Sequence, residues 1–151
     1  MADVHEMLIA ETDGACSYCG IKDYRVLTTH HIIQQEPKDD SYDNKILLCH
    51  NCHHLYHNNK GPSQKDLLDI KKRLIFKMLT QQGANAMKES YRKGMVAGSP
   101  YLINHLVELQ LLEFVEVIST IDTHSNEEAI VDAIYQLTSK GRQFAEKWDL
   151  K

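Results

Sequence analysis

All four cysteines lie between positions 16 and 52, in two pairs that each enclose two residues. The pairs are Cys16-Ser17-Tyr18-Cys19 and Cys49-His50-Asn51-Cys52. A two-residue spacing lets a tight turn aim both sulfur atoms at one ion, and two such turns complete a closed tetrahedral site. We therefore expect a structural Zn²⁺ on Cys16, Cys19, Cys49 and Cys52. The alternatives are two disulfides or four unrelated thiols; the acidic N-terminal segment does not read as a secretion signal, which disfavours disulfides.

Six of the nine histidines lie between positions 30 and 57. His53 and His57 are four residues apart in a predicted helix, so their rings share a face and can hold one divalent ion. His30 and His31 are neighbours at the end of a predicted strand, where adjacent side chains point to opposite faces. One of them can bind an ion while the other addresses a nearby water. For any single histidine, a surface or satisfied core position is the alternative.

The segments around these residues predict a strand, a loop, a second strand and a helix. Residues 25–33 are rich in β-branched side chains, whereas residues 34–44 hold a proline and three aspartates and no apolar periodicity. KILLC at 45–49 reads as a short buried strand, and a helix is expected from Asn51 or Cys52 to a stop at 58–62. The cysteine site would thus anchor this helix immediately before its histidine pair.

Together these residues resemble the HNH endonucleases, or ββα-metal nucleases. The match runs through Cys16-x2-Cys19, Thr29-His30-His31-Ile32, Asn44 and Leu47-Leu48-Cys49-x2-Cys52-His53-x3-His57. The resemblance implies a β-hairpin packed on a helix around one catalytic divalent ion. It further implies that His30, His53 and His57 bind this ion, that His31 is the general base, and that Asn44 holds the loop and orients the base. Products would carry 5′-phosphate and 3′-hydroxyl ends, and the ion could be Mg²⁺, Mn²⁺, Ni²⁺ or Zn²⁺.

An amphipathic helix is expected to follow this module and to link it to the rest of the chain. Ser63 and Asp66 resemble a capping box, and an apolar stripe runs from Leu67 to Leu79. Lys71 and its basic neighbours fall mostly on the polar side, and the helix is expected to end near Gly83. The predicted division is a zinc-stapled module at 1–62, a linking helix at 63–83 and a second domain at 84–151.

The second domain is predicted to mix helices and strands. The expected elements are a helix at 85–96, a turn at 97–100, a helix at 101–112, strands at 114–121 and 134–137, and a helix at 139–148. Leu102, Leu106 and Leu109 are spaced for burial. The form of the acidic stretch at 122–132 is left open.

The second domain resembles a winged-helix domain, through YLINHLVEL at 101–109, LLE at 111–113 and YQLTSKGRQF at 135–144. In that family the helix from Pro100 would read a major groove. Here its exposed positions, Tyr101, Asn104, His105 and Glu108, include no lysine or arginine, and the wing is acidic. The best phosphate contacts are Lys88, Arg92 and Lys93. A domain for self-association or for a protein partner is an equally strong interpretation.

The chain is therefore expected to be an α+β metal-dependent endonuclease, cytoplasmic, that acts on nucleic acid and preferably DNA. The fold would be a ββα-metal module, a linker helix and a winged helix-turn-helix-like domain. The net charge of −4 counts against nucleic-acid binding, although bound divalent ions would offset it. No apolar run is long enough to span a membrane. A non-catalytic zinc-containing DNA-binding regulator and a protein-interaction adaptor are the alternatives, and a homodimer or protein partner would use the C-terminal domain.

Overall fold

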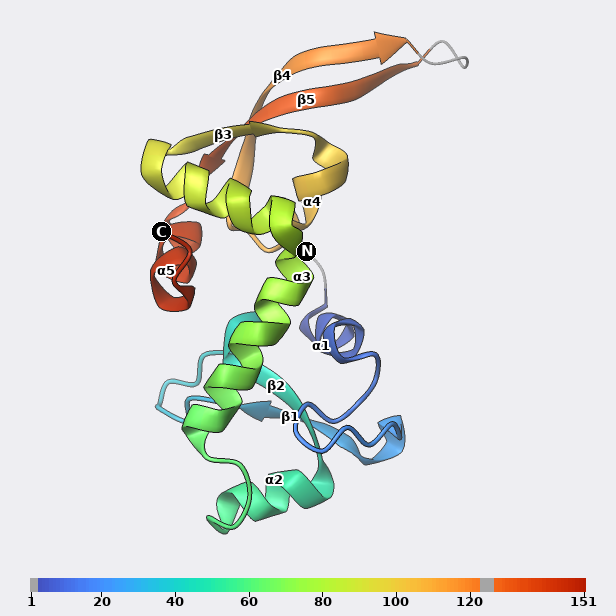
Figure 1. Ribbon diagram of the computed structural model, residues 1–151, viewed down its shortest axis with the longest axis vertical. Helices are drawn as coiled ribbons and strands as arrows, with labels where there is room; N and C mark the ends of the chain where they lie inside the picture. The colour runs from blue at the N-terminus through green and yellow to red at the C-terminus, as the bar shows by residue number, and fades with distance from the viewer. Residues whose placement is uncertain (1–2, 123–126) are drawn as a thin grey trace. The chain divides into compact units, whose positions relative to one another are not determined.

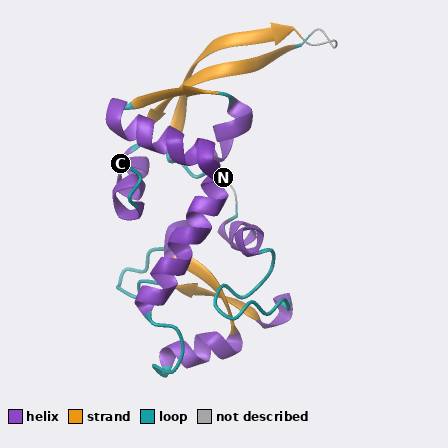
Figure 2. Ribbon diagram, viewed as in Figure 1, coloured by secondary structure: helices purple, strands orange, loops and turns teal. Residues whose placement is uncertain are grey.

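The computed structural model describes residues 3–122 and 127–151. These residues form two units, of which the first ends at Met78 and the second begins at Leu79. Figure 1 labels the helices and strands along the chain, and Figure 2 colours the same view by secondary structure. No helix among the described residues is both long enough and apolar enough to cross a membrane.

The N-terminal unit is built on a two-stranded antiparallel hairpin. Strand β1 (Leu27–His31) pairs with β2 (Lys45–Cys49), and α2 (His50–His57) begins where β2 ends. The strand predicted at 25–33 is shorter, because Tyr24–Val26 form a 3-10 turn. The unit also contains α1 (Val4–Thr12) and the first part of α3 (Gln64–Lys93). Its core joins the following buried side chains: Ile32, Ile46, Leu48, Leu67 and three of the cysteines.

Helix α3 crosses the boundary between the units and is interrupted at Thr80. Thr80 has φ 64° and ψ 172°, which is not helical, and two helices meet at this residue. The first therefore ends close to the expected Gly83, and the second begins before the expected Asn85 and ends at Lys93 rather than at Val96. The interruption leaves the carbonyl of Leu79 without its usual helical partner, and Nε2 of His105 donates a hydrogen bond to it at 3.1 Å. His105, expected to be exposed, is therefore half-buried.

A buried ion pair joins α1 to α3 in the N-terminal unit. The side chains of Lys71 and Glu11 are both fully buried, and Nζ of Lys71 lies 2.9 Å from Oε1 of Glu11. The hydroxyl of Tyr42 donates to the same carboxylate, and Nζ of Lys71 lies 3.6 Å from the centre of the Tyr42 ring. Burial raises the pKa of Glu11, and Lys71 and Tyr42 oppose that rise. The prediction that Lys71 lies on the polar side of its helix was wrong.

Replacing Lys71 with alanine is expected to destabilise the protein by about 3–5 kcal/mol, because the Glu11 carboxylate would remain buried without its partner. Urea unfolding followed by circular dichroism measures the change. The exposed residue Arg73 supplies the control, and Arg73→Ala should change the free energy of unfolding by less than about 0.5 kcal/mol. Equal effects of the two substitutions would contradict the interpretation.

The C-terminal unit contains a three-stranded antiparallel sheet in the order β3-β5-β4. Strand β3 (Met95–Gly98) replaces the expected end of a helix and turn, while β4 (Leu112–Asp122) and β5 (Glu128–Leu137) extend the two expected strands. Part of the acidic stretch whose form was left open therefore belongs to β5, and residues 123–126 lie outside the described residues. Helix α5 (Ser139–Trp148) has the predicted bounds.

Helix α4 (Pro100–Glu108) is shorter than the helix predicted at 101–112. It buries Ile103 and Leu106, whereas Leu102 is 52 % exposed rather than buried as expected. The buried face of α4 therefore differs from the predicted one. Ile103 packs toward β3, where its Cδ1 would lie 3.0 Å from a Cβ added at Gly98. The resemblance of this unit to a winged-helix domain stays a prediction.

Gly141 allows α5 to approach the turn before β4. A Cβ added at this glycine would lie 2.0 Å from the carbonyl oxygen of Leu111. Gly141→Ala is therefore expected to destabilise the C-terminal unit by about 3 kcal/mol, since backbone would have to move. The single tryptophan, Trp148, is buried on the same helix, so its fluorescence follows unfolding. Gln143→Ala, an exposed substitution on α5, is the control and should leave the transition unchanged.

Candidate functional site

The four cysteines converge in the N-terminal unit. Their Sγ atoms all lie within 4.8 Å of one another, and those of Cys19 and Cys49 are 3.7 Å apart. Cys16, Cys49 and Cys52 are buried, and Cys19 is exposed. Cys49 ends β2 and also serves as the N-cap of α2, since its Sγ accepts a hydrogen bond from the backbone N–H of Cys52. The cluster thus lies at the start of α2.

The donor set fits a zinc ion. Four sulfur donors within one small volume are the ligands of a closed tetrahedral zinc site. Burial raises the pKa of Cys52, and the neighbouring thiols raise it further. For Cys16, burial acts in the same direction, but hydrogen bonds from the backbone of Cys19, Cys49 and Tyr18 outweigh it and lower the pKa to about 7. A divalent cation would favour the thiolate form at all four positions.

Three imidazoles converge at a second point, between the hairpin and α2. The nitrogens that His30, His53 and His57 offer lie within 4.8 Å of one another. Nε2 of His53 lies 3.0 Å from Nε2 of His57, and the ring centre of His30 lies 4.9 Å from that of His53. The i, i+4 spacing on α2 and the inward side of β1 bring these rings together.

His30 is the most buried of the three, at 2 % exposure. Its Nε2 is buried, and no described residue forms a hydrogen bond with it, so a ligand would satisfy an otherwise costly buried nitrogen. Burial lowers the pKa of His30 to about 4, with added repulsion from His53, His57 and His31. Burial and His57 also lower the pKa of His53. Neutral imidazole is the form that binds metal ions; a ligand role for these three histidines stays a prediction.

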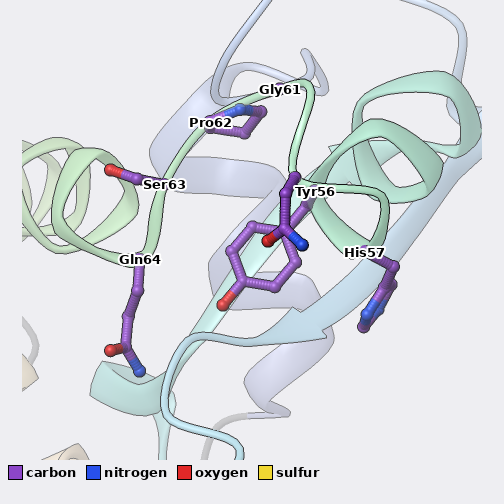
Figure 3. Close-up of a pocket in the computed structure, with 7 residues that line it drawn as sticks. Tyr56, His57, Gly61, Pro62, Ser63 and Gln64 are labelled. Atoms are coloured by element: carbon purple, nitrogen blue, oxygen red, sulfur yellow. The ribbon is translucent and has the colours of Figure 1, made fainter.

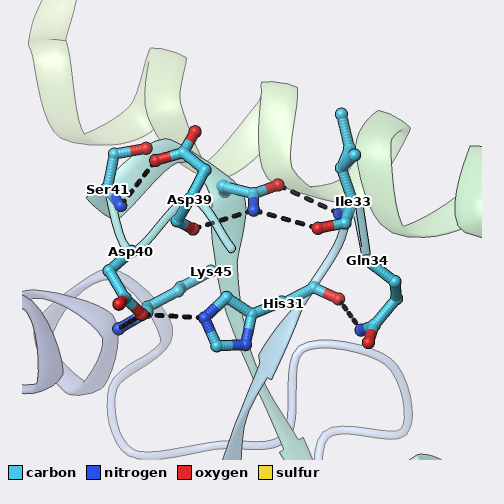
Figure 4. A network of polar contacts seen from close by, with 8 residues as sticks. His31, Ile33, Gln34, Asp39, Asp40, Ser41 and Lys45 are labelled. Atoms are coloured by element: carbon cyan, nitrogen blue, oxygen red, sulfur yellow. Dashed lines mark hydrogen bonds and ion pairs between the residues drawn. The ribbon is translucent and has the colours of Figure 1, made fainter. Parts of the chain in front are cut away.

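His31 lies on the opposite side of β1 from His30. Its Nε2 is 2.8 Å from Oδ1 of Asp40, and Nζ of Lys45 lies 2.8 Å from the same oxygen (Figure 4). Hydrogen bonds from Lys45 and His31 lower the pKa of Asp40 to about 2, so this carboxylate is ionised near neutral pH and can only accept. A neutral His31 therefore carries its proton on Nε2, which leaves the lone pair of Nδ1 available.

Asn44 closes the loop between the two strands. It is 1 % exposed, and its Oδ1 accepts from the backbone N–H of Ile33 at 3.0 Å. Its Nδ2 donates to the carbonyls of Ile33 and Asp39, at 3.2 and 2.9 Å. Asn44 makes no direct hydrogen bond to His31 among the described contacts. It fixes the loop beside Asp40, the residue that contacts His31; a role of Asn44 in orienting His31 stays a prediction.

A pocket of about 410 Å³ lies beside His57 in the same unit. It is formed where α2 ends and α3 begins, and Figure 3 shows the ring of Tyr56 between His57 and Gln64. The turn is tight, since a Cβ added at Gly61 would lie 2.7 Å from Cβ of Leu55. The lining residues are Tyr56, His57, Asn59, Gly61, Pro62, Ser63 and Gln64. Of the three converging histidines, His57 lines this pocket.

The predicted phosphate contacts lie in the C-terminal unit, on α3. Lys88, Arg92 and Lys93 line a smaller pocket of about 310 Å³ with Asn85 and Glu89. Nζ of Lys93 is 2.9 Å from Oε1 of Glu89, so part of the positive charge is already paired. A nucleic-acid-binding role for these residues stays a prediction.

Part of the N-terminal unit matches a known protein family. Residues 16–59 match the family model for HNH endonuclease. The matched stretch contains both cysteine pairs, the three converging histidines, His31 and Asn44. No curated protein and no solved structure gives a significant match. The family match indicates a nuclease or nucleic-acid-related function with a metal site, and the four cysteines are positioned to bind a structural metal.

The sequence did not indicate two residues that lie near His31 in the structure. Asp40 and Lys45 form the polar contact that fixes its tautomer, yet Asp40 is one of three aspartates in its loop, with nothing in the sequence to distinguish it. The strand pattern offered one signal, because His31 pairs with Lys45 in the hairpin register. Residues on paired positions lie side by side on one face.

Proposed function

We propose that the protein is a metal-dependent endonuclease that hydrolyses phosphodiester bonds in nucleic acid, with DNA as the preferred substrate. The observation that carries the proposal is the convergence of His30, His53 and His57 beside an open pocket, within a stretch that matches the HNH family. When bound, a divalent ion on these imidazoles would polarise the phosphate and neutralise charge on the leaving oxygen.

In this proposal His31 supplies the general base. Nδ1 accepts a proton from the attacking water, while Nε2–H stays hydrogen-bonded to Asp40. The water oxygen bonds to phosphorus, and the bond between phosphorus and the 3′ oxygen breaks. The departing 3′ oxygen takes a proton from solvent water, which gives a 5′-phosphate and a 3′-hydroxyl, and His31 later returns its proton to solvent. The Asp40 carboxylate stabilises the imidazolium that forms, and Asn44 holds the loop that carries Asp40.

Further assignments belong to the same proposal. We assign the four-cysteine site to structural zinc, which would fix the start of α2 and with it His53. We also propose that the C-terminal unit is a winged-helix-like domain that supplies targeting or association.

The test is plasmid cleavage by protein that keeps zinc at the four cysteines but has been freed of more weakly bound metal. Mg²⁺, Mn²⁺, Ni²⁺ or Zn²⁺ is then added. The parent should convert supercoiled plasmid to nicked circles, and the His53→Ala, His57→Ala double variant should lose this activity and bind one fewer divalent ion. His54→Ala is the matched control, because His54 lies between them on α2 but outside the cluster. A parent protein inert with every metal, on DNA and on RNA, would overturn the proposal.

A further inference from the structure

The pocket beside His57 is lined by groups that suit a neutral, planar ligand. Its volume of about 410 Å³ lies within the range of about 300–1,000 Å³ that is typical of small-ligand sites. Its polar side chains are a phenol, two carboxamides, a hydroxyl and an imidazole, from Tyr56, Asn59, Gln64, Ser63 and His57. None of the described residues that line it is a lysine, an arginine or an acid. A phosphate group would therefore find no fixed cation there, whereas a nucleobase would find an aromatic ring and amide groups.

Two of the lining side chains are held in place by the rest of the N-terminal unit. The ring of Tyr56 lies edge-on to the imidazoles of His30 and His57, with ring centres 4.4 and 5.3 Å apart. Nε2 of Gln64 donates a hydrogen bond to the carbonyl of Ile32 at 3.1 Å. Both side chains are therefore ordered before a ligand binds, which lowers the entropic cost of binding.

The lining also has hydrogen-bonding atoms that the protein itself does not use. Among the described contacts, Oε1 of Gln64, the hydroxyl of Tyr56 and the carboxamide of Asn59 have no hydrogen-bond partner. Figure 3 shows the Tyr56 ring in the middle of these groups, between His57 and Gln64. A carboxamide presents a donor and an acceptor side by side, which matches the edge of a base. The pocket thus offers both a ring and directional polar contacts.

We propose that this pocket holds an unpaired nucleobase of the nucleic acid that the protein cleaves, an inference that rests on the proposed nuclease function. His57 both lines the pocket and belongs to the three-histidine cluster, so the base belongs to a nucleotide close to the cleaved phosphate. A base inside a duplex is paired and stacked, and it must leave the stack to enter a pocket. Single-stranded nucleic acid is therefore the preferred substrate class, and a duplex is cleaved more slowly because one base must unpair.

Binding of a short fluorescein-labelled DNA strand, followed by fluorescence anisotropy at one fixed low salt concentration, tests the proposal. The protein keeps zinc at the four cysteines and is freed of weakly bound metal, so that binding is measured without cleavage. The other two probes are the duplex of this strand and a strand of equal length whose nucleotides lack bases. The parent should bind the normal strand at least about 10-fold more tightly than the abasic strand, because stacking and amide contacts are lost with the base. It should also bind the strand more tightly than the duplex.

Asn59→Gly localises this preference to the pocket. The substitution removes one carboxamide, and glycine suits the φ of 55° at this position. It should reduce the preference for the normal strand over the abasic strand by at least about 5-fold. Asn58→Ala is the matched control, since the Asn58 carboxamide donates to the carbonyl of His54 at 2.8 Å and does not line the pocket. Asn59→Asp, which also tolerates a positive φ, replaces Asn59→Gly if circular dichroism shows that the latter misfolds.

Equal affinity of the parent for the normal and abasic strands would overturn the proposal, and so would an Asn59→Gly protein that keeps the parent's preference. Plasmid cleavage separates this failure from failure of the proposed function. A parent that cleaves plasmid but shows no base preference is a nuclease without the base pocket. A parent that shows the Asn59-dependent preference but cleaves nothing with any metal has the base pocket and is not a nuclease.

Discussion

Cys49→Ser is expected to unfold most of the N-terminal unit and to abolish tight zinc binding. Cys49 is both a member of the four-cysteine cluster and the N-cap of α2, so the substitution removes one metal ligand and weakens the helix start. Structural zinc sites contribute roughly 10–16 kcal/mol of apparent binding free energy. That is as large as the whole stability of a typical domain, about 5–15 kcal/mol. Metal analysis and far-ultraviolet circular dichroism measure the two effects.

The control for this substitution is Ser17→Ala, within the other cysteine pair. The hydroxyl of Ser17 is buried, and no described residue forms a hydrogen bond with it, so its removal should leave zinc content and helicity unchanged. Prolonged chelation of the parent should reproduce the spectrum of Cys49→Ser. A Cys49→Ser protein that keeps its helix content and one tightly held zinc would refute the structural role of the cluster.

His31→Ala is expected to lower the cleavage rate by about 10²–10⁴-fold, which is the usual contribution of a general base. The loss should appear in kcat, because His31 lies outside the three-histidine cluster. Asp40→Asn should lower kcat less than His31→Ala does, since Asp40 is 74 % exposed and water can partly replace it. Initial rates on a short duplex at saturating metal separate kcat from KM.

Two controls accompany this comparison. Zinc content and circular dichroism should match the parent for both variants, because the contacts removed lie on the loop side of β1. Asp39→Asn, a neighbouring substitution in the same loop, should keep the parent rate, since the Asp39 side chain bonds only the backbone of Ser41 among the described contacts. Full activity of His31→Ala with every metal would remove His31 from the proposed mechanism.

The metal-binding half was readable from sequence because its geometry is mostly local. Cysteines paired with two residues between them, and histidines four positions apart on a helix, need only a turn and a helix to converge. KILLC occupies the predicted strand. The ion pair of Lys71 with Glu11 was not readable. It joins residues 60 positions apart, and a lysine in a helical pattern is usually solvent-exposed. Its burial depends on α1 and Tyr42, which no local pattern reveals.

The elements of the C-terminal unit were harder to predict from sequence, because they also depend on contacts between distant residues. Strand β3 has only four residues, and just one of them, Val96, is buried, so no alternation marks it. Gly83 indicated a helix end close to Thr80, but the exact position of the interruption involves a hydrogen bond from the distant His105 to Leu79. The apolar pattern of α4 does not determine whether Leu102 or Ile103 is buried. Packing beside Gly98 buries Ile103 and leaves Leu102 exposed.

The register of the hairpin determines which of two identical side chains on β1 projects from each face. His30 and His31 are both histidines, yet they project from opposite faces. His30 pairs with Ile46 and its ring faces the interior, whereas His31 pairs with Lys45 and its ring faces the other side. A slip by a single residue would exchange them. Hydrogen bonds from Ile32 and Ile33 to Asn44 secure the end of the hairpin, and this closed end keeps the two imidazoles on their separate faces.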